Sequence, residues 1–385
     1  MTDVVIAGIG QTEVGEHYDI SLRDLGLMAI SEARRDAGGL RPEVMFVGNM
    51  LAPSVSHQAH LGALLTDYGN LLGIEGSTVE AGGASGGAAL RMAYMAVASG
   101  EANVALAIGV EKITDQLGPA SESSWSLSTD SDYEAVQGLT PTAQAALVMR
   151  RYMHEYGVGH EVFGGFAVTA HANAVHNPHA MFRSPISLDT YNNAGLVSEP
   201  LNLFDIAPVA DGAAAVILTR ADLLPAKTPQ ALVRISGSNM TTDRLALHDR
   251  SDLLAFEAAR TSVQRACRQA GILPGDVDLF ELTDSYSVYA ALSLEAAGFA
   301  VRGQGWQLAS QGKLALQGLL PIATFGGMKA RGNPGGAAGM YQAVEATLQL
   351  RGLAGDNQVP GARRALIQNL AGPASTAVTH VLEAL

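Results

Sequence analysis

One sequence pattern occurs once in each half of this chain, and it constrains the fold more than any other feature. Residues 37–47 (AGGLRPEVMFV) and residues 270–280 (AGILPGDVDLF) share a helix stop, a Pro turn and an apolar strand. Each copy follows a predicted strand and a predicted helix, over 3–9 and 21–37 in the first half and over 231–238 and 252–270 in the second. A repeated strand–helix–strand unit indicates a duplicated α/β fold with much parallel pairing.

We therefore expect four segments along the chain. Residues 1–110 form the first core half, residues 206–230 return to it, and residues 231–385 form the second core half. The remaining residues, 111–205, fit neither half and combine a serine-rich stretch with a predicted helix near 141–156. This loop-rich insertion is either a structural flap or a place where a substrate is contacted.

The net charge of −13 excludes two classes of partner. Nucleic acids and anionic membrane surfaces need a cationic protein surface. An anionic small ligand is still compatible with this charge, because a local patch can override the overall sign. The start of the sequence lacks a signal-peptide pattern, and no apolar run approaches the roughly 20 residues of a membrane span, so we expect a cytoplasmic protein.

Neither the cysteine nor the histidines point to a metal site. Cys267 is the only cysteine, so no disulfide can form within the chain, and its place inside a predicted helix is typical of core packing. His171, His176 and His179 cluster, but their spacing does not suit one helix face, and a proline interrupts the segment. We expect no bound metal.

The segment Gly83-Ala-Ser-Gly-Gly lies between a predicted strand and a predicted helix and allows two interpretations. It matches the Gly-x-Ser-x-Gly pattern of hydrolases, with Ser85 as nucleophile and Asp211 or Asp284 followed by His380 as partners. However, His380 falls inside a predicted strand, and no upstream oxyanion loop is visible. The other interpretation is that the glycines let a helix start pack tightly, with free N–H groups facing a ligand.

Two further glycine-rich segments carry weaker signals. Gly8 and Gly10 follow a predicted strand, but no helix opens at the third position of a dinucleotide fingerprint, so we expect a simple turn there. Residues 326–339 (GGMKARGNPGGAAG) form a turn of the kind that brings backbone amides close to a ligand. Lys329 and Arg331 within it are expected to meet either a phosphate or solvent.

A switch from apolar to polar residues marks the end of a strand in the second half. Asp284, Ser285 and Tyr286 follow it, where open α/β sheets bind ligands. Asp284 has either a site role or a capping role at this position.

Taken together, the chain resembles the thiolase superfamily, in particular its archaeal-type and lipid-transfer-protein-like branch. The resemblance covers nearly the whole chain and rests on VEAGGASGGAALRMAY, GVEKITD, YMHEYG, AHANAVHNP, DIAPVADGAAAV, LHDRSDLLAFEAA, GGMKARGNPGGAAG and STAVTHVLE. It implies two similar βαβ-type core halves in a layered α-β-α-β-α arrangement, plus an inserted loop domain. It also implies an acyl-CoA thioester as substrate or ligand, no covalently bound cofactor, and a homodimer or higher oligomer.

The resemblance assigns three catalytic positions, and all three carry unusual residues. Gly83 stands at the position of the nucleophilic cysteine, Asn333 at that of the general-base histidine, and Thr283 at that of a residue that polarises the thioester oxygen. Glycine offers no atom for an acyl-enzyme, and asparagine does not titrate near neutral pH. The ligand-binding residues that we expect from the glycine-rich frame are Ser85, Gly326, Gly327, Gly332 and Gly336.

This pattern resembles steroid side-chain aldolases, which are thiolase-like proteins with glycine at the nucleophile position and a small zinc-ribbon/OB-fold partner. We therefore expect carbon–carbon bond cleavage or formation of the aldol type on an acyl-CoA, with Asp284 or Tyr286 as proton acceptor. Those aldolases use tyrosines where this chain has Thr283 and Asn333, although Tyr286 and Tyr341 are nearby in sequence. One alternative is an inactive homologue that serves as an acyl-CoA-binding or scaffold subunit, and another is an acyltransferase that uses Ser85.

Overall fold

The strands of the two halves pair in the same order. A computed structural model describes residues 3–116, 118–224 and 231–385, and it contains a nine-stranded mixed sheet in the order β3-β2-β4-β7-β1-β8-β11-β10-β9. The run β2-β4-β7-β1 repeats as β9-β10-β11-β8: in both runs the first pair is parallel and the others are antiparallel. The duplication predicted from the sequence is therefore present in the topology.

The strands of the first half are β1 (Val4–Gln11), β2 (Val44–Gly48), β3 (Glu75–Val79), β4 (Val104–Glu111) and β7 (Gly212–Arg220). Those of the second half are β8 (Val233–Thr242), β9 (Leu279–Leu282), β10 (Arg364–Ala371) and β11 (Thr376–Ala384). The halves join through a short antiparallel contact of β1 with β8, where Val5 faces Arg234 and Ile6 faces Val233. The expected boundary at residue 230 falls in 225–230, outside the described residues.

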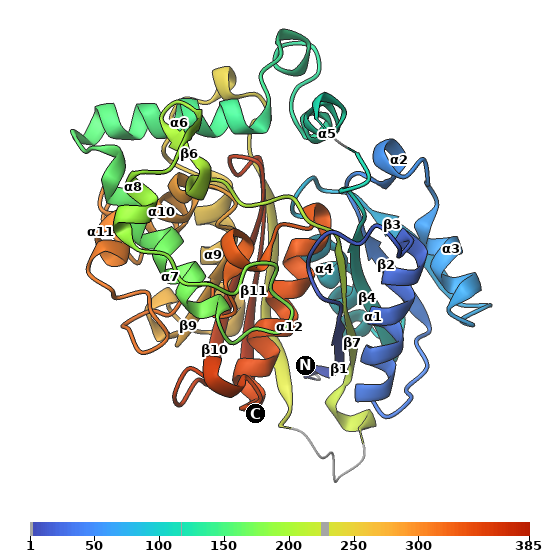
Figure 1. The fold of residues 1–385 in the computed structure, drawn as a ribbon. Coiled ribbons are helices and arrows are strands. Elements are labelled where there is room, and N and C mark those ends of the chain that lie inside the picture. The colour runs from blue at the N-terminus through green and yellow to red at the C-terminus, as the bar shows by residue number, and fades with distance from the viewer. Residues whose placement is uncertain (1–2, 117, 225–230) are drawn as a thin grey trace.

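Helices lie between the two half-sheets and on both outer faces (Figure 1). Two central helices, α4 (Ser85–Ser99) and α12 (Ala338–Arg351), each contact strands of both halves. On the outer faces, α1 (Leu22–Asp36) covers β1, β4 and β7, and α9 (Glu257–Ala270) covers β8 and β11. The layers therefore run α-β-α-β-α as expected, with shorter helices α2 (Ala52–Val55), α3 (Leu61–Tyr68), α10 (Ser287–Ala296) and α11 (Gly305–Ser310) around them.

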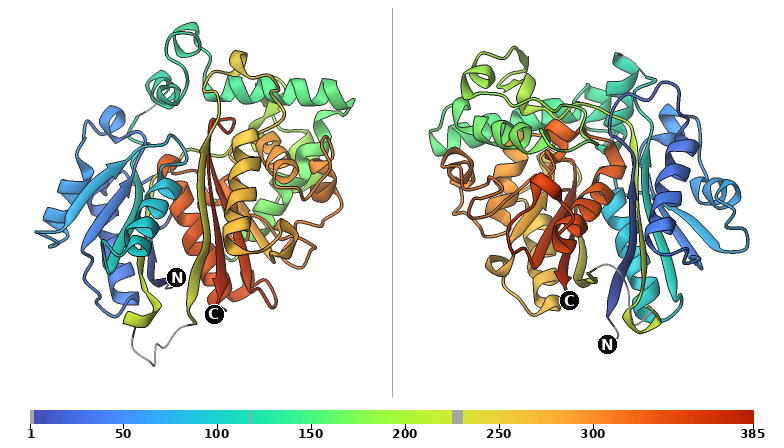
Figure 2. Two further views of the ribbon diagram at one scale, coloured as in Figure 1. Left: turned by 180° about the vertical axis from the view of Figure 1, so that it is seen from behind. Right: turned by 60° about the horizontal axis from the view of Figure 1, so that its bottom comes forward.

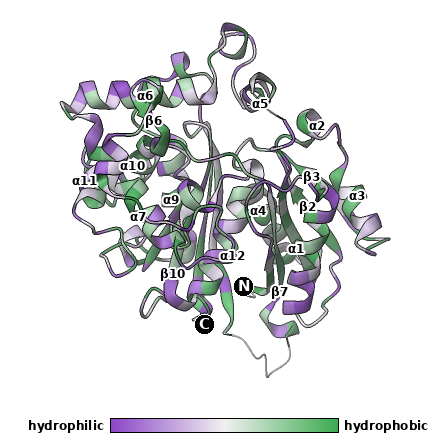
Figure 3. Cartoon of the chain, viewed as in Figure 1, coloured by the Kyte–Doolittle hydropathy of each residue, from purple (hydrophilic) through white to green (hydrophobic). Residues whose placement is uncertain are grey.

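The insertion covers one end of the molecule. It contains α5 (Pro119–Trp125), α6 (Pro141–Tyr156), α7 (Gly164–Ala174), α8 (Leu188–Asn192) and the small hairpin β5 (Leu196–Ser198) and β6 (Leu201–Asn202). In the views of Figures 1 and 2, α5 and α6 lie at the end opposite to both termini. Figure 3 shows hydrophilic and hydrophobic residues alternating along α6, whose Val148, Met149 and Tyr152 are buried.

Gly8 and Gly10 do not form the turn that we predicted. Both lie within β1, beside a register shift between Ile6 and Gly8. A Cβ atom at Gly8 would stand 2.3 Å from the carbonyl oxygen of Ala33, and one at Gly10 would stand 2.4 Å from that of Ala29. The glycines are thus needed because the backbone of α1 lies directly against β1.

Within residues 3–116, 118–224 and 231–385, no helix has both the length and the apolar character that crossing a bilayer requires.

We predict that Gly10→Ala destabilises the fold by about 1–3 kcal/mol, because the new methyl group must push the backbone of α1 away from the sheet. Chemical denaturation of both proteins measures the difference. Gly15→Ala is the matched control, since nothing lies within 4 Å of the Cβ position at Gly15. Equal stability of the two variants would contradict the close approach of α1.

Candidate active site

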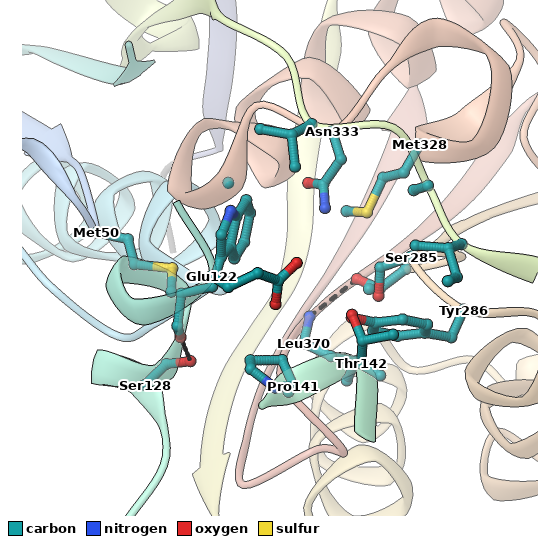
Figure 4. A pocket seen from close by; sticks show the side chains of 18 residues that line it. Met50, Glu122, Ser128, Pro141, Thr142, Ser285, Tyr286, Met328, Asn333 and Leu370 are labelled. Carbon is teal, nitrogen blue, oxygen red and sulfur yellow. Dashed lines mark hydrogen bonds between the residues drawn. The ribbon is translucent and has the colours of Figure 1, made fainter. Parts of the chain in front are cut away.

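A pocket opens where the two halves and the insertion meet. Among the expected site residues, Gly83, Thr283, Tyr286 and Asn333 line it. The insertion and the return segment add Glu122, Trp125, Ser128, Pro141, Thr142, Ile206, Ala207 and Val209, and the remaining lining residues are Met50, Ser285, Met328, Gly335, Leu370 and Gly372. Figure 4 shows the side chains of Asn333, Glu122 and Tyr286 converging on this space. The insertion is therefore part of the pocket wall and not only a flap.

Gly83 faces the pocket just before α4 begins. An added Cβ atom at this position would stand 2.9 Å from the carbonyl oxygen of Leu370. Because that oxygen belongs to the backbone of β10, it cannot turn aside as a flexible side chain would. The local structure is therefore fitted to glycine.

Ser85 does not face the pocket, and its hydroxyl is fully engaged by the backbone. It donates a hydrogen bond to the Gly82 carbonyl at 2.6 Å and accepts one from the Ala81 amide at 2.9 Å. The side chain is 0% exposed. These bonds hold the strand-to-helix turn, and they leave the hydroxyl no access to a substrate.

The alternative Ser-His-Asp arrangement is not assembled. His380 is buried in β11, its Nε2 atom lies 3.1 Å from the Gly87 carbonyl, and burial lowers the pKa of its imidazole to about 4. Asp211 accepts hydrogen bonds from the Ile113 and Thr114 amides and the Thr114 hydroxyl, and pairs with Lys112 at 3.1 Å. The Gly-x-Ser-x-Gly match therefore reflects packing and not hydrolase chemistry.

Thr283 has its hydroxyl between two backbone groups. It donates to the Gln368 carbonyl at 3.2 Å and accepts from the Leu370 amide at 3.0 Å. The single hydrogen of the hydroxyl is thus used, so Thr283 has no free donor with which to polarise a thioester oxygen. Through these two bonds, the hydroxyl links the end of β9 to β10 beside the pocket.

Asn333 presents a free carboxamide to the pocket. Its backbone is held by a bond from its amide to the Pro208 carbonyl at 2.8 Å and by a bond from the Ala210 amide to its carbonyl at 3.2 Å. Figure 4 shows the side chain directed into the pocket, and within the described part of the chain no hydrogen bond engages it. It is available to donate to a ligand oxygen.

Tyr286 lies on the opposite wall. Its hydroxyl lies 3.1 Å from the hydroxyl of Thr142, which links the second core half to the insertion. Burial, with a smaller contribution from the negative charge of Glu122, raises the pKa of the phenol to about 12. Near neutral pH the group is therefore protonated, so it suits the role of a donor and not that of a proton acceptor.

Asp284 is turned away from the pocket. It is 2% exposed, and its Oδ1 atom accepts from the Met328 amide at 2.7 Å. Burial raises the pKa of this carboxyl, against the opposing effect of the nearby Lys329 charge. Asp284 thus anchors the glycine-rich segment and does not contact the pocket.

Lys329 and Arg331 are buried and engaged by other groups of the protein, whereas we expected them to meet a phosphate or solvent. Lys329 is buried and donates to the carbonyls of Phe204 and Asp205 at 3.1 and 2.8 Å, and burial lowers the pKa of its ammonium group to about 8. Arg331 is buried in an ion pair with Glu345 at 2.6 Å. Both cations fasten the segment to its surroundings, as buried charges require.

The glycines expected to bind a ligand lie behind the pocket wall. Of the glycines in the segment 326–339, Gly335 lines the pocket, and the four that we expected to bind a ligand do not: Gly326, Gly327, Gly332 and Gly336. Their φ angles of +105° at Gly326, +54° at Gly327 and +109° at Gly332 explain why glycine is needed there. The residues thus shape the turn, while Asn333 carries the exposed polar group.

The most informative residues that sequence reasoning missed come from the insertion. Glu122, Trp125 and Thr142 belong to no motif, and nothing in their local sequence indicates that they reach the two core halves.

Cys267 does not line the pocket. It is buried in α9, and burial raises the pKa of its thiol to about 11. Within the described residues, no group of histidine, cysteine, aspartate and glutamate side chains could hold a metal.

Comparisons with known proteins cover nearly the whole chain. The model of the thiolase N-terminal domain matches residues 4–222, and that of the thiolase C-terminal domain-like family matches residues 239–384. An acetyl-CoA acetyltransferase of Methanothermobacter thermautotrophicus is 39% identical over 99% of both chains. Subunit BbsB of the benzoylsuccinyl-CoA thiolase of Thauera aromatica is 30% identical over 93% of this chain and 90% of that one. The solved structure of an Ltp2-ChsH2(DUF35) aldolase is similar with a TM-score of 0.84 and 26% identity, over 99% of this chain and 98% of that chain.

We predict that Gly83→Ala lowers the free energy of unfolding by about 1–3 kcal/mol, because the methyl group presses on the Leu370 carbonyl. Thermal or chemical unfolding measures the loss. Gly195→Ala is the control, since its Cβ position has nothing within 4 Å. A Gly83→Ala protein as stable as the wild type would show that the turn has room for a side chain.

Proposed function

The chain belongs to the thiolase family, and we propose that it acts on an acyl-CoA thioester without forming an acyl-enzyme, by making or breaking a carbon–carbon bond in an aldol-type reaction. The observation that carries this proposal is a pocket that Gly83 lines and whose described lining contains no thiol. By the family resemblance, Gly83 stands at the position expected for the nucleophilic cysteine. The cysteine of the chain and the serine of the Gly-x-Ser-x-Gly match are both unsuitable as nucleophiles, because Cys267 is buried elsewhere and Ser85 is engaged by the backbone.

The remaining polar groups suit stabilisation of an enolate. The Asn333 carboxamide and the Tyr286 phenol are donors on opposite walls of the pocket. Donors held in place toward a developing oxyanion lower the barrier to enolate formation, and an aldol or retro-aldol step requires only an enolate and a base. The apolar side chains of Met50, Ile206 and Met328 offer a surface for an acyl chain.

The relatives also support a partner protein. One of them is named as a subunit of a thiolase, and one similar structure is an aldolase composed of Ltp2 and a DUF35 protein. We propose that this chain likewise works with a small protein of the DUF35, zinc-ribbon/OB-fold type. Self-association into a dimer or higher oligomer stays a prediction from the family resemblance.

The test is to incubate the chain, alone and with a co-encoded DUF35 protein, with a panel of β-hydroxyacyl-CoA compounds. We expect equal amounts of a shorter acyl-CoA and an aldehyde or ketone, with the mass of the protein unchanged. Cys267→Ala is expected to react as fast as the wild type, because no thiol takes part.

Two outcomes would contradict the proposal. An acyl adduct on the protein, or activity that depends on Cys267, would show covalent chemistry. Calorimetric binding of acyl-CoA with no turnover of any compound, with or without the partner, would instead identify a non-catalytic binding subunit.

A further inference from the structure

The proposed reaction needs a proton acceptor, and neither residue expected for that role is suited to it. Asp284 is buried behind the pocket and occupied by the Met328 amide. Tyr286 lines the pocket, but the phenol remains protonated near neutral pH. Asn333 cannot titrate. The base must therefore come from another part of the lining.

Among the lining residues that the structure describes, Glu122 is the one carboxylate, and no lysine or arginine accompanies it. Figure 4 shows its carboxylate directed into the pocket, between the side chain of Asn333 and those of Thr142 and Tyr286. No hydrogen bond engages this carboxylate within residues 3–116, 118–224 and 231–385. It also lies close enough to Tyr286 to influence the phenol electrostatically.

The helix that carries Glu122 is held against the first core half. Trp125 follows by three residues in α5, so both side chains lie on one helix face, and both line the pocket. Trp125 packs against the apolar cluster of Leu51, Val55 and Ile113. The hydroxyl of Ser124 adds a contact with that of Ser54 at 3.2 Å. Glu122 therefore has a defined place at the pocket mouth.

We propose that Glu122 is the proton-transferring catalytic residue of the aldol-type reaction, an inference that rests on the proposed function. In the cleavage direction, its carboxylate takes the proton of the β-hydroxyl group. The Cα–Cβ bond breaks, the β-carbon becomes a carbonyl, and the electron pair passes to the enolate of the acyl-CoA. Tyr286 and Asn333 donate hydrogen bonds to the charged oxygen. Glu122 then returns the proton to Cα, which restores the carboxylate and releases the shorter acyl-CoA.

The experiment compares wild type, Glu122→Gln, Glu122→Asp and Asp132→Asn, each with the DUF35 partner and β-hydroxyacyl-CoA substrates. We expect Glu122→Gln to lower kcat by about 10²–10⁴-fold, the usual contribution of a positioned acid–base group, with Glu122→Asp between it and the wild type. Asp132→Asn removes the same charge from an exposed site of the same insertion and is expected to leave kcat unchanged. Thermal unfolding checks that all variants are folded, which the exposed position of Glu122 favours.

A second measurement follows exchange of the Cα hydrogens of the product acyl-CoA in D₂O by mass spectrometry, which reports enolate formation without bond cleavage. Loss of both cleavage and exchange in Glu122→Gln supports the role of Glu122. Wild-type rates of both in Glu122→Gln would overturn it and leave the proposed function standing. If the wild type neither cleaves nor exchanges any substrate, the proposed function fails and the role of Glu122 fails with it.

Discussion

The site depends on the close approach of the two central helices where they begin. A Cβ atom at Gly86 of α4 would stand 2.8 Å from the Gly336 carbonyl and 2.9 Å from the Met340 amide. One at Gly339 of α12 would stand 2.1 Å from Asn369 Oδ1 and 2.7 Å from the Gly87 amide. Glycine is required on both sides of this contact, because any side chain would separate the helices. The contact draws the turn before α4 and the turn before α12 together, and thereby places Gly83 and Asn333 in one pocket.

Buried charges hold the second of these turns in position. Arg331 pairs with Glu345 of α12, and Lys329 reaches the backbone at Asp205, which in turn accepts hydrogen bonds from Tyr191 and His160 of the insertion. A buried charge without a partner costs several kcal/mol, so these contacts resist displacement of the segment. Lys329 and Arg331, which we expected from the sequence to meet a phosphate or solvent, thus help to join the core to the insertion.

The side chains that line the pocket determine which reactions it can support. The polar groups that line the space include the Asn333 amide, the Tyr286 phenol and the Glu122 carboxylate, together with the hydroxyls of Ser128, Thr142 and Ser285. Hydrogen-bond donors and one carboxylate suffice for an enolate that is formed and quenched within the site, whereas acyl transfer through a thiolate needs a cysteine, and the described lining contains none. The insertion supplies the carboxylate, so the segment that fits neither core half is the one that completes the proposed site.

The sequence by itself determined the duplicated architecture, because periodic apolar patterns and paired glycine turns are local signals that the fold retains. Strands β2 and β9 follow the repeated turns, and α6 spans the predicted helix 141–156. It also located Gly83, Asn333 and Tyr286, which lie in recognisable motifs. Only the tertiary structure decided which neighbouring residues face the pocket. Asp284 and Tyr286 are two positions apart, yet one is buried behind the wall and the other lines it, because the hydrogen bond from the Met328 amide turns Asp284 away. Glu122 lies at the pocket because Trp125 of the same helix packs against Leu51 and Val55, which are far away in the sequence. Such long-range contacts leave no pattern in the local sequence.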